Sequence, residues 1–151
     1  MVMRKAARAI IIEGDKILVM HRNNGGNEYF TLVGGRHDDK DGTNMEDTLA
    51  REVMEETGLI VTKSQLVFIE SHPKPYNEQY IYLCEVAPHE AIAIQDASEE
   101  ALLNKISINL HEPLWAITSS FSHLQFRTPQ LQAAIIDGVK NGFPSRPLNI
   151  S

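Results

Sequence analysis

The sequence predicts an α/β domain in which helices pack against a mixed β-sheet. Two observations near the N-terminus support this: apolar, β-branched runs of strand length, separated by turn signals, and then a strongly periodic helical segment over residues 43–57. A second helical pattern over residues 129–141 completes the set. At 151 residues the chain is expected to form one domain, residues 1–151, with a core of its own.

The first strands are expected to form a hairpin. Residues 7–13 are apolar, Gly14 and Asp15 are typical of a turn, and residues 16–21 resume the apolar run. Residues 23–27 are polar and glycine-rich, which favours a loop. A short strand over residues 29–33 then leads into Gly34 and Gly35.

Residues 43–57 have the clearest helical pattern in the chain. Thr43 and Glu46 have the spacing of a capping box, which predicts Thr43 as the N-cap. Gly58 has the position of a C′ glycine. The apolar stripe repeats at i, i+4 and i+8 and comprises Met45, Leu49 and Val53. This face should pack on the core.

The second half of the chain has weaker signals. They predict strands over residues 66–71, 79–86 and 114–117, a short helix over 99–105, and a closing helix over 129–141. The closing helix should turn Leu131, Ile135 and Val139 inward, and Trp115 should anchor the core. Residues 142–151 contain two prolines and are expected to form an irregular tail.

Composition narrows the function classes. The net charge of −6 argues against a nucleic-acid polymer as partner, although a bound metal can still attract a small polyanion. Cys84 is the only cysteine, so no intramolecular disulfide forms, and its apolar surroundings predict a buried thiol. No apolar run suits a signal peptide or a membrane span, so the cytoplasm is the expected location. The oligomeric state stays open, with a homodimer as one option.

Three glutamates point to a metal. Glu52, Glu55 and Glu56 are related as i, i+3 and i+4, so a helix places them on one face. No Lys or Arg follows any of them at i+4, and the repulsion destabilises the helix unless a cation binds. Carboxylate oxygens suit Mg²⁺, above all when phosphate supplies further oxygens. The pattern predicts Mg²⁺ held against a phosphorylated substrate.

The run Arg-Glu-Val-Met-Glu-Glu-Thr-Gly-Leu over residues 51–59 resembles the second half of the Nudix box. The resemblance implies a Nudix-type α/β/α sandwich around a mixed sheet. The first half of the box departs from the family pattern: Val33 replaces a proline, and His37 and Thr43 stand where the pattern has Gly and Glu. If residues 42–43 match the usual Gly-Glu, the loop after Gly35 is about two residues longer than is usual.

The resemblance also implies site residues. Glu52, Glu55 and Glu56 match the family's ligands for divalent cations, here Mg²⁺ with Mn²⁺ as an alternative, and the carbonyl of Gly35 matches a further ligand. Arg51 would orient these carboxylates. The general base would be Glu55 or a residue of a later loop, which offers Asp96, Glu99 and Glu100.

Other candidates come from residue chemistry. Arg22 and Arg36 could contact phosphate, because guanidinium forks suit phosphate oxygens, or they could be ordinary surface residues. Three aromatic side chains could stack on a base or pack in the core: Tyr29, Phe30 and Tyr80. Three histidines without metal-ligand spacing complete the candidates: His21, His37 and His72. The acidic loop of Asp38, Asp39 and Asp41 lacks the twelfth-position Glu of a calcium loop.

The implied activity is a Mg²⁺-dependent hydrolysis of the pyrophosphate bond in nucleoside diphosphate-linked compounds. The expected partner is a small nucleotide: a nucleoside triphosphate, oxidised forms included, ahead of a nucleotide sugar such as ADP-ribose. The alternative is a Nudix-fold module that binds a nucleotide without cleaving it, since fold does not fix function. Product release from a nucleotide panel, with and without Mg²⁺, separates the two.

Overall fold

The computed structural model describes residues 4–38, 44–93 and 109–151. Within them, eight strands form the mixed sheet that the sequence predicted: β1 Lys5–Glu13, β2 Lys16–Asn24, β3 Asn27–Thr31, β4 Val33–Arg36, β5 Val61–Ser71, β6 Glu78–Val86, β7 Asn109–Ile117 and β8 Leu148–Ile150. The helical elements are α1 Met45–Thr57, the 3₁₀ segment η2 Thr118–His123 and α3 Pro129–Asn141.

Strand β1 is a central strand of the sheet and pairs with three other strands. It pairs in parallel with β6 and antiparallel with β2 and β4. Strand β5 continues the sheet antiparallel to β6, and β8 adds a parallel strand at its edge. Strand β2 also pairs with β3 and β7 on the other side. This mixture of parallel and antiparallel pairs brings β1, β4 and β6 together beneath α1.

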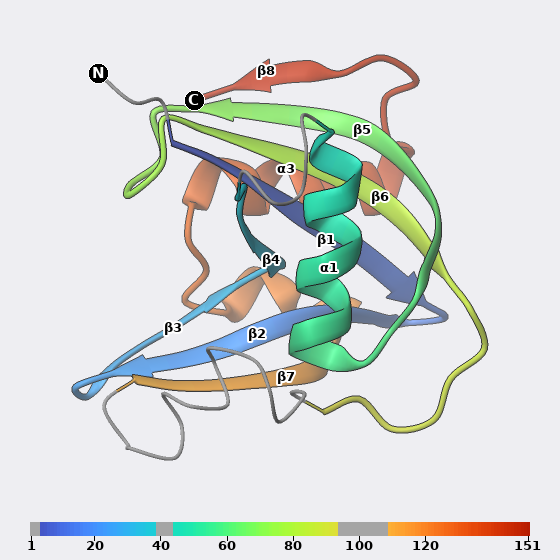
Figure 1. Cartoon of the computed structure of the whole chain (residues 1–151). Coiled ribbons are helices and arrows are strands. Elements are labelled where there is room, and N and C mark those ends of the chain that lie inside the picture. Colours follow the sequence, from blue (N-terminus) through green and yellow to red (C-terminus); the bar gives the residue numbers. More distant parts are fainter. Residues whose placement is uncertain (1–3, 39–43, 94–108) are drawn as a thin grey trace.

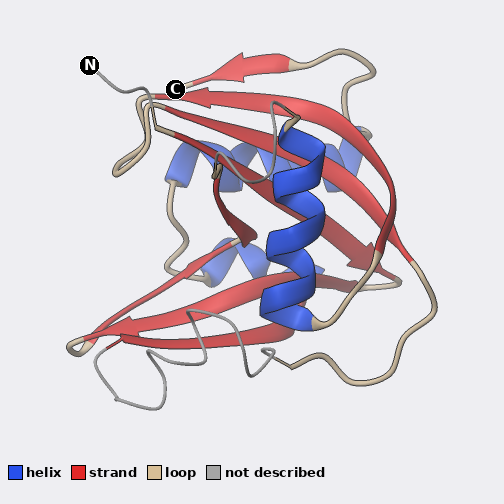
Figure 2. Ribbon diagram, viewed as in Figure 1, coloured by secondary structure: helices blue, strands red, loops and turns tan. Residues whose placement is uncertain are grey.

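The helices cover opposite faces of the sheet. Helix α1 crosses in front of β1 and β4, while α3 and η2 lie behind (Figure 1, Figure 2). Side chains alternate along β1, so Ala9 packs with Leu49 of α1, whereas Ile10 packs with Leu131 of α3. Two core clusters, one per face, give the α/β/α layering that the resemblance implied.

The start of α1 differs from the expectation. Asn44 is the N-cap, and its Oδ1 accepts a hydrogen bond from the Glu46 amide at 2.8 Å. Thr43, which the capping box favoured, lies outside the described residues. Asn is at least as good an N-cap as Thr, so the neighbouring residue takes the role.

The C-terminal part also corrects the sequence analysis. Residues 142–151 are not wholly irregular, because Phe68 of β5 pairs with Leu148 of β8. Helix α3 has the predicted bounds and buries Leu131 and Ile135, but Val139 is 43% exposed and Gly138 is buried instead. A Cβ on Gly138 would lie 2.3 Å from the Phe143 ring, so Phe143 fills the space beside the helix at Gly138.

Smaller differences concern element boundaries. Residues 23–27 form only a tight turn at Gly25 and Gly26, both with positive φ, and strands β2 and β3 extend to it. The strand expected over 29–33 divides into β3 and β4, with Leu32 between them. Strand β7 begins at Asn109, five residues before the expected start. The helix expected over 99–105 lies outside the described residues.

Two other expectations concern single side chains. Cys84 is buried as predicted, at 6% exposure, and burial raises the pKa of its thiol to about 12. Trp115 is partly buried against the cluster beneath α1 and stacks on His89, with ring centroids 6.1 Å apart. Neither described helix has the length and apolar character needed to span a membrane.

Candidate metal and phosphate site

Helix α1 sets two of its glutamates against the glycine backbone of β4. The Gly34 amide donates a hydrogen bond to Glu56 Oε1 at 2.6 Å, and Glu56 is fully buried. Gly34 has φ +140°, and a Cβ there would lie 2.1 Å from the Ala7 carbonyl oxygen. Only glycine therefore allows β4 to lie so close to β1 while its amide faces α1.

Gly35 makes the next close approach. A Cβ on Gly35 would lie 2.4–2.6 Å from the carboxylate atoms of Glu52, which is 8% exposed. The missing side chain leaves room for the Glu52 carboxylate beside the main chain of β4. Glu52 thus lies beside the backbone of Gly35, and Glu56 lies beside that of the adjacent Gly34. These contacts bring together three of the residues that the resemblance implied for a metal site, namely Gly35, Glu52 and Glu56.

Arg51 lies among the carboxylates. Its Nη1 is 3.1 Å from Glu52 Oε1 and 3.3 Å from Glu55 Oε2, and its Nη2 donates to the Arg36 carbonyl at 3.4 Å. No Lys or Arg follows the glutamates at i+4, but Arg51 precedes all three. These contacts are what an orienting role for Arg51 requires, and they offset part of the repulsion.

The donor set fits Mg²⁺ that is shared with a substrate. Across the described residues, no three acidic, His or Cys side chains converge closely enough to hold a metal ion by themselves. Mg²⁺ usually takes one or two carboxylates and completes its shell with water and phosphate oxygens. Glu52 and Glu56 supply such carboxylates, and the main chain of Gly35 lies beside Glu52.

The two candidate phosphate contacts differ in position. Arg22 Nη2 lies 4.0 Å from Glu56 Oε2, and its Nε donates to Thr31 Oγ1 at 2.9 Å. Arg36 is exposed, and its main chain rather than its guanidinium contacts Arg51. Among the base candidates, Glu55 lies at the rim with a side chain 36% exposed, while Glu99, Glu100 and Asp96 lie outside the described residues.

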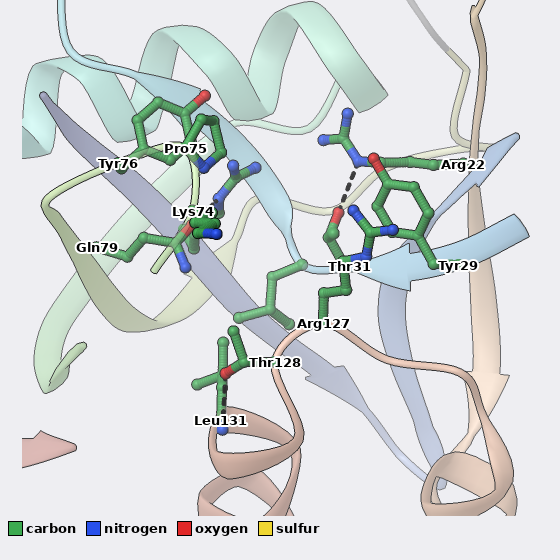
Figure 3. Close-up of a pocket in the computed structure, with 12 residues that line it drawn as sticks. Arg22, Tyr29, Thr31, Lys74, Pro75, Tyr76, Gln79, Arg127, Thr128 and Leu131 are labelled. Carbon is green, nitrogen blue, oxygen red and sulfur yellow. Dashed lines mark hydrogen bonds between the residues drawn. The ribbon is translucent and has the colours of Figure 1, made fainter. Parts of the chain in front are cut away.

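A pocket of about 180 Å³ adjoins the carboxylates on the α3 side of the sheet (Figure 3). Four of its lining side chains are cations, namely Arg8, Arg22, Lys74 and Arg127, and we call it the cationic pocket. Its other lining residues are Tyr29, Thr31, Leu32, Pro75, Tyr76, Gln79, Thr128 and Leu131. The pocket meets the carboxylate site at Gly34, whose carbonyl accepts a hydrogen bond from Arg8 Nη1 at 3.0 Å.

Most residues of this pocket were not predicted from the sequence. Arg8 is a residue whose position in the sequence could have indicated the pocket, because it is a charged residue between apolar residues of β1. It is buried, at 7% exposure. Gln79 and Glu70 are buried polar residues in strands in the same way. Lys74 and Arg127 carried no such signal, because they lie in loops far apart in the sequence.

The aromatic candidates have separate surroundings. Tyr29 lines the cationic pocket, with Arg127 Cζ 3.7 Å from its ring centroid. Phe30 packs against the core cluster on the α3 face and stacks on His21, with ring centroids 4.9 Å apart. Tyr80 lies 5.6 Å from Lys5 Nζ. Only Tyr29 of the three borders the pocket.

Within the described ranges, the histidines do not join a group of three or more potential metal ligands. His37 Nδ1 lies 2.7 Å from Thr48 Oγ1, and His72 is exposed with φ 57°. His111 was not among the candidates from the sequence; it is opposite Arg22 in the pairing of β7 with β2 and is 5% exposed. Burial, with the nearby Arg22 charge second, lowers the pKa of His111 to about 4.

Solved structures share this fold. The MutT protein from Bacillus halodurans is 18% identical, with a TM-score of 0.62, over 97% of this chain and 87% of that one. An ADP-ribose pyrophosphatase from Streptococcus suis is also 18% identical, with a TM-score of 0.62, over 99% and 100%. The NUDIX domain of Shewanella oneidensis NrtR, complexed with ADP ribose, is 16% identical, with a TM-score of 0.66, over 93% and 88%.

The comparison with curated protein sequences gives no match. The identities to the solved structures are too low to show more than the fold. The sequence model of the NUDIX domain, however, matches residues 3–123, well over half of the chain. The protein therefore belongs to the NUDIX domain family.

Proposed function

We propose that the protein is a Mg²⁺-dependent hydrolase that cleaves the pyrophosphate bond of a small nucleoside diphosphate-linked compound. The observation that carries the proposal is the meeting of Glu52 and Glu56 with the glycine backbone of β4, next to a pocket of cations. The carboxylates suit a divalent cation, and the pocket suits the remainder of a phosphorylated substrate.

The reaction is a substitution at phosphorus. Water forms a new P–O bond, the bond to the bridging oxygen breaks, and a phosphate or pyrophosphate group leaves with that oxygen. Mg²⁺ bound by Glu52, Glu55 and Glu56, with the Gly35 carbonyl, would neutralise phosphate oxygens and acidify the attacking water. Mn²⁺ would serve the same purpose. There is little covalent work for the protein, so positioning and charge stabilisation dominate.

The side chains have distinct roles in this scheme. Arg22 holds a phosphate oxygen beside Glu56, since its guanidinium already lies within 4.0 Å of that carboxylate. Arg51 keeps Glu52 and Glu55 in place from the exposed side. Glu55 at the rim is the described candidate for the base that takes the proton from water, and Glu99 and Glu100 are the alternatives.

For the substrate, we place a nucleoside triphosphate, oxidised forms included, ahead of a nucleotide sugar such as ADP-ribose. Solved structures of this fold include proteins named for each choice, MutT and an ADP-ribose pyrophosphatase. A competition assay with nucleoside triphosphates and ADP-ribose at equal concentrations tests this ranking. Preferential hydrolysis of ADP-ribose over every triphosphate tested would reverse it.

The test compares Glu56→Gln with Glu85→Gln. Glu56→Gln keeps the size of a buried side chain but removes its charge, so Mg²⁺-dependent turnover should fall by roughly a hundredfold or more. Glu85, 71% exposed beside Lys63, is the control and should keep wild-type turnover. The assay is release of phosphate or pyrophosphate, and circular dichroism verifies folding. Near-normal turnover in folded Glu56→Gln would exclude the metal assignment.

The second candidate is a module that binds a nucleotide without cleaving it. It is favoured by the NUDIX domain of NrtR, whose structure contains ADP ribose, and by the departures at His37 and Thr43. Tight binding of a triphosphate or of ADP-ribose with no product in Mg²⁺ or Mn²⁺ would support it. Wild-type product formation that is lost in Glu56→Gln would exclude it.

A further inference from the structure

The cationic pocket has a marked excess of positive charge. Its lining contains four cations and no carboxylate among the described residues. Arg8, Lys74 and Arg127 form no ion pair with any residue of the described ranges. The protein has a net charge of −6, yet three cations without an ion pair line one cavity. This concentration of positive charge indicates that the cavity binds an anion.

Arg8 shows that the pocket is built rather than a chance gathering of surface side chains. It is 7% exposed, its Nε donates to Gln79 Oε1 at 2.9 Å and its Nη1 donates to the Gly34 carbonyl at 3.0 Å. Tyr76 covers it, with the ring centroid 5.7 Å from Arg8 Cζ. Burying a guanidinium against neutral acceptors is costly, which favours a charged ligand.

A buried carboxylate fixes this arrangement from behind. Gln79 Nε2 donates to Glu70 Oε1 at 3.0 Å, and Thr128 Oγ1 donates to Glu70 Oε2. Glu70 is fully buried and does not line the pocket, so it orients Gln79 and Thr128 rather than meeting the ligand. Gln79 thereby presents its carbonyl oxygen to Arg8 and holds the guanidinium in position.

The mouth of the pocket adds exposed cations. In Figure 3, Lys74 lies with Pro75 and Tyr76 on one side, and Arg127 lies beside Tyr29 on the other. Lys74 and Arg127 are exposed, so they can reach a ligand as it enters. Arg127 is held by its contact with the Tyr29 ring and by its own amide, which donates to the Phe30 carbonyl at 2.9 Å.

The pocket and the carboxylate site share Gly34. Its amide binds Glu56 and its carbonyl binds Arg8, so the two sites lie on either side of one residue. We infer that the cationic pocket binds a second phosphoryl group of the substrate, one that is separate from the pyrophosphate cleaved at the carboxylates. This inference rests on the proposed function and specifies its substrate class.

A neutral base is the competing occupant, stacked on Tyr29 or Tyr76. It would use the tyrosines, but it would leave Arg8, Lys74 and Arg127 without an ion-pair partner among the described residues. Each charge-assisted hydrogen bond to a phosphate contributes more than a neutral one. The balance therefore favours a phosphate over a base.

Pairs of compounds that differ by one phosphate test the inference. They are ADP-ribose 2′-phosphate with ADP-ribose, coenzyme A with dephospho-coenzyme A, and guanosine 5′-diphosphate 3′-diphosphate with GDP. Calorimetry with Ca²⁺ in place of Mg²⁺ measures the dissociation constants while suppressing turnover. In at least one pair, the compound with the extra phosphate should bind about tenfold tighter or more.

The variants assign this preference to the pocket. Lys74→Gln and Arg127→Gln change exposed side chains, so folding should be intact, and the preference should fall by several-fold. Lys63→Gln removes a lysine with a 77% exposed side chain that does not line the pocket, and it should keep the wild-type preference. Equal affinities within all three pairs, or a preference unchanged in both pocket variants, would overturn the inference.

The hydrolysis assay in Mg²⁺ keeps the two proposals apart. If the compounds are bound with the expected preference but none is cleaved, the proposed hydrolysis fails and the phosphate pocket stands. If they are cleaved at equal efficiency within each pair and bound equally, the hydrolysis stands and the second phosphate site is wrong.

Discussion

Gly34 and Gly35 are adjacent, yet their missing side chains serve different purposes. The space beside Gly35 is occupied by the Glu52 carboxylate, whereas the space beside Gly34 is occupied by the backbone of β1. A carboxylate at the end of a flexible side chain can move aside, but a strand backbone in a sheet cannot. The first glycine therefore serves the fold and the second serves the site.

Gly35→Ala should leave the protein folded and displace Glu52. Stability should stay within about 1 kcal/mol of wild type, since the clash involves the end of a side chain. A carboxylate displaced by about 1 Å can lower turnover by roughly a hundredfold. Thermal unfolding and Mg²⁺-dependent turnover measure the two effects. Wild-type turnover in Gly35→Ala would contradict the placement of Glu52 in the site.

Gly34→Ala is the matched contrast and should lose more than about 2 kcal/mol, through the clash with Ala7 and the strained φ. Gly26→Ala separates these causes, because Gly26 also has positive φ but has nothing within 4 Å of its added Cβ. It should lose only about 1 kcal/mol.

His111 should make stability depend on pH. Its pKa in the folded protein is about 4, below the 6.5 of an unperturbed histidine, so the unfolded state binds the proton more readily. Stability from this group is present above pH 6.5 and is lost as the pH falls toward 4. Between pH 7 and pH 5 the loss should be about 2 kcal/mol. Urea unfolding of wild type and His111→Gln at both pH values measures it, and an equal loss in both proteins would contradict the assignment.

At the scale of elements, the end of α3 shows why helical periodicity misplaced one side chain. The pattern predicted Val139 as inward, but Phe143 folds back onto the helix and covers Gly138. Periodicity describes a helix alone, and it carries no information about a ring that arrives from the following segment. The N-cap of α1 is similar: two neighbouring residues of good capping chemistry competed, and Asn44 took the position.

The effect of Gly138→Ala on stability should therefore depend on whether Phe143 is present. In a helix interior this substitution ordinarily stabilises by about 1 kcal/mol, but here the new Cβ would lie 2.3 Å from the Phe143 ring. In wild type it should destabilise, and in a Phe143→Ala background it should stabilise. A double-mutant cycle by chemical unfolding measures both effects. Stabilisation in both backgrounds would show that Phe143 does not occupy this space.

At the scale of the whole molecule, local patterns predicted the layers and the acidic face, and long-range assembly determined the rest. Glu52 and Glu56 could be found because they lie within one helical turn of each other. The cationic pocket could not, because β1, β3, the loop after β5 and the start of α3 each contribute to it. Strand β8 escaped detection for the same reason: three residues have no periodicity, and pairing with β5 defines them as a strand.

The molecule as a whole is acidic, whereas the cationic pocket is positively charged. The salt dependence of KM should show whether repulsion by the whole protein or attraction by the pocket dominates substrate binding. The net charge of −6 repels an anion at long range, but the exposed Lys74 and Arg127 line the cationic pocket and attract an anion at short range. Raising the salt from about 0.1 M to about 1 M shortens the screening length from about 10 Å to about 3 Å. At constant Mg²⁺, KM for a nucleotide should rise roughly threefold or more, and kcat should change little because Glu52 and Glu56 are buried.

The salt dependence of KM should be weaker in Lys74→Gln and unchanged in Lys63→Gln, which lies outside the pocket. Steady-state kinetics over a salt series measures these slopes. A KM that falls as salt rises would mean that repulsion by the whole protein outweighs attraction by the pocket, and it would contradict this electrostatic account of substrate capture.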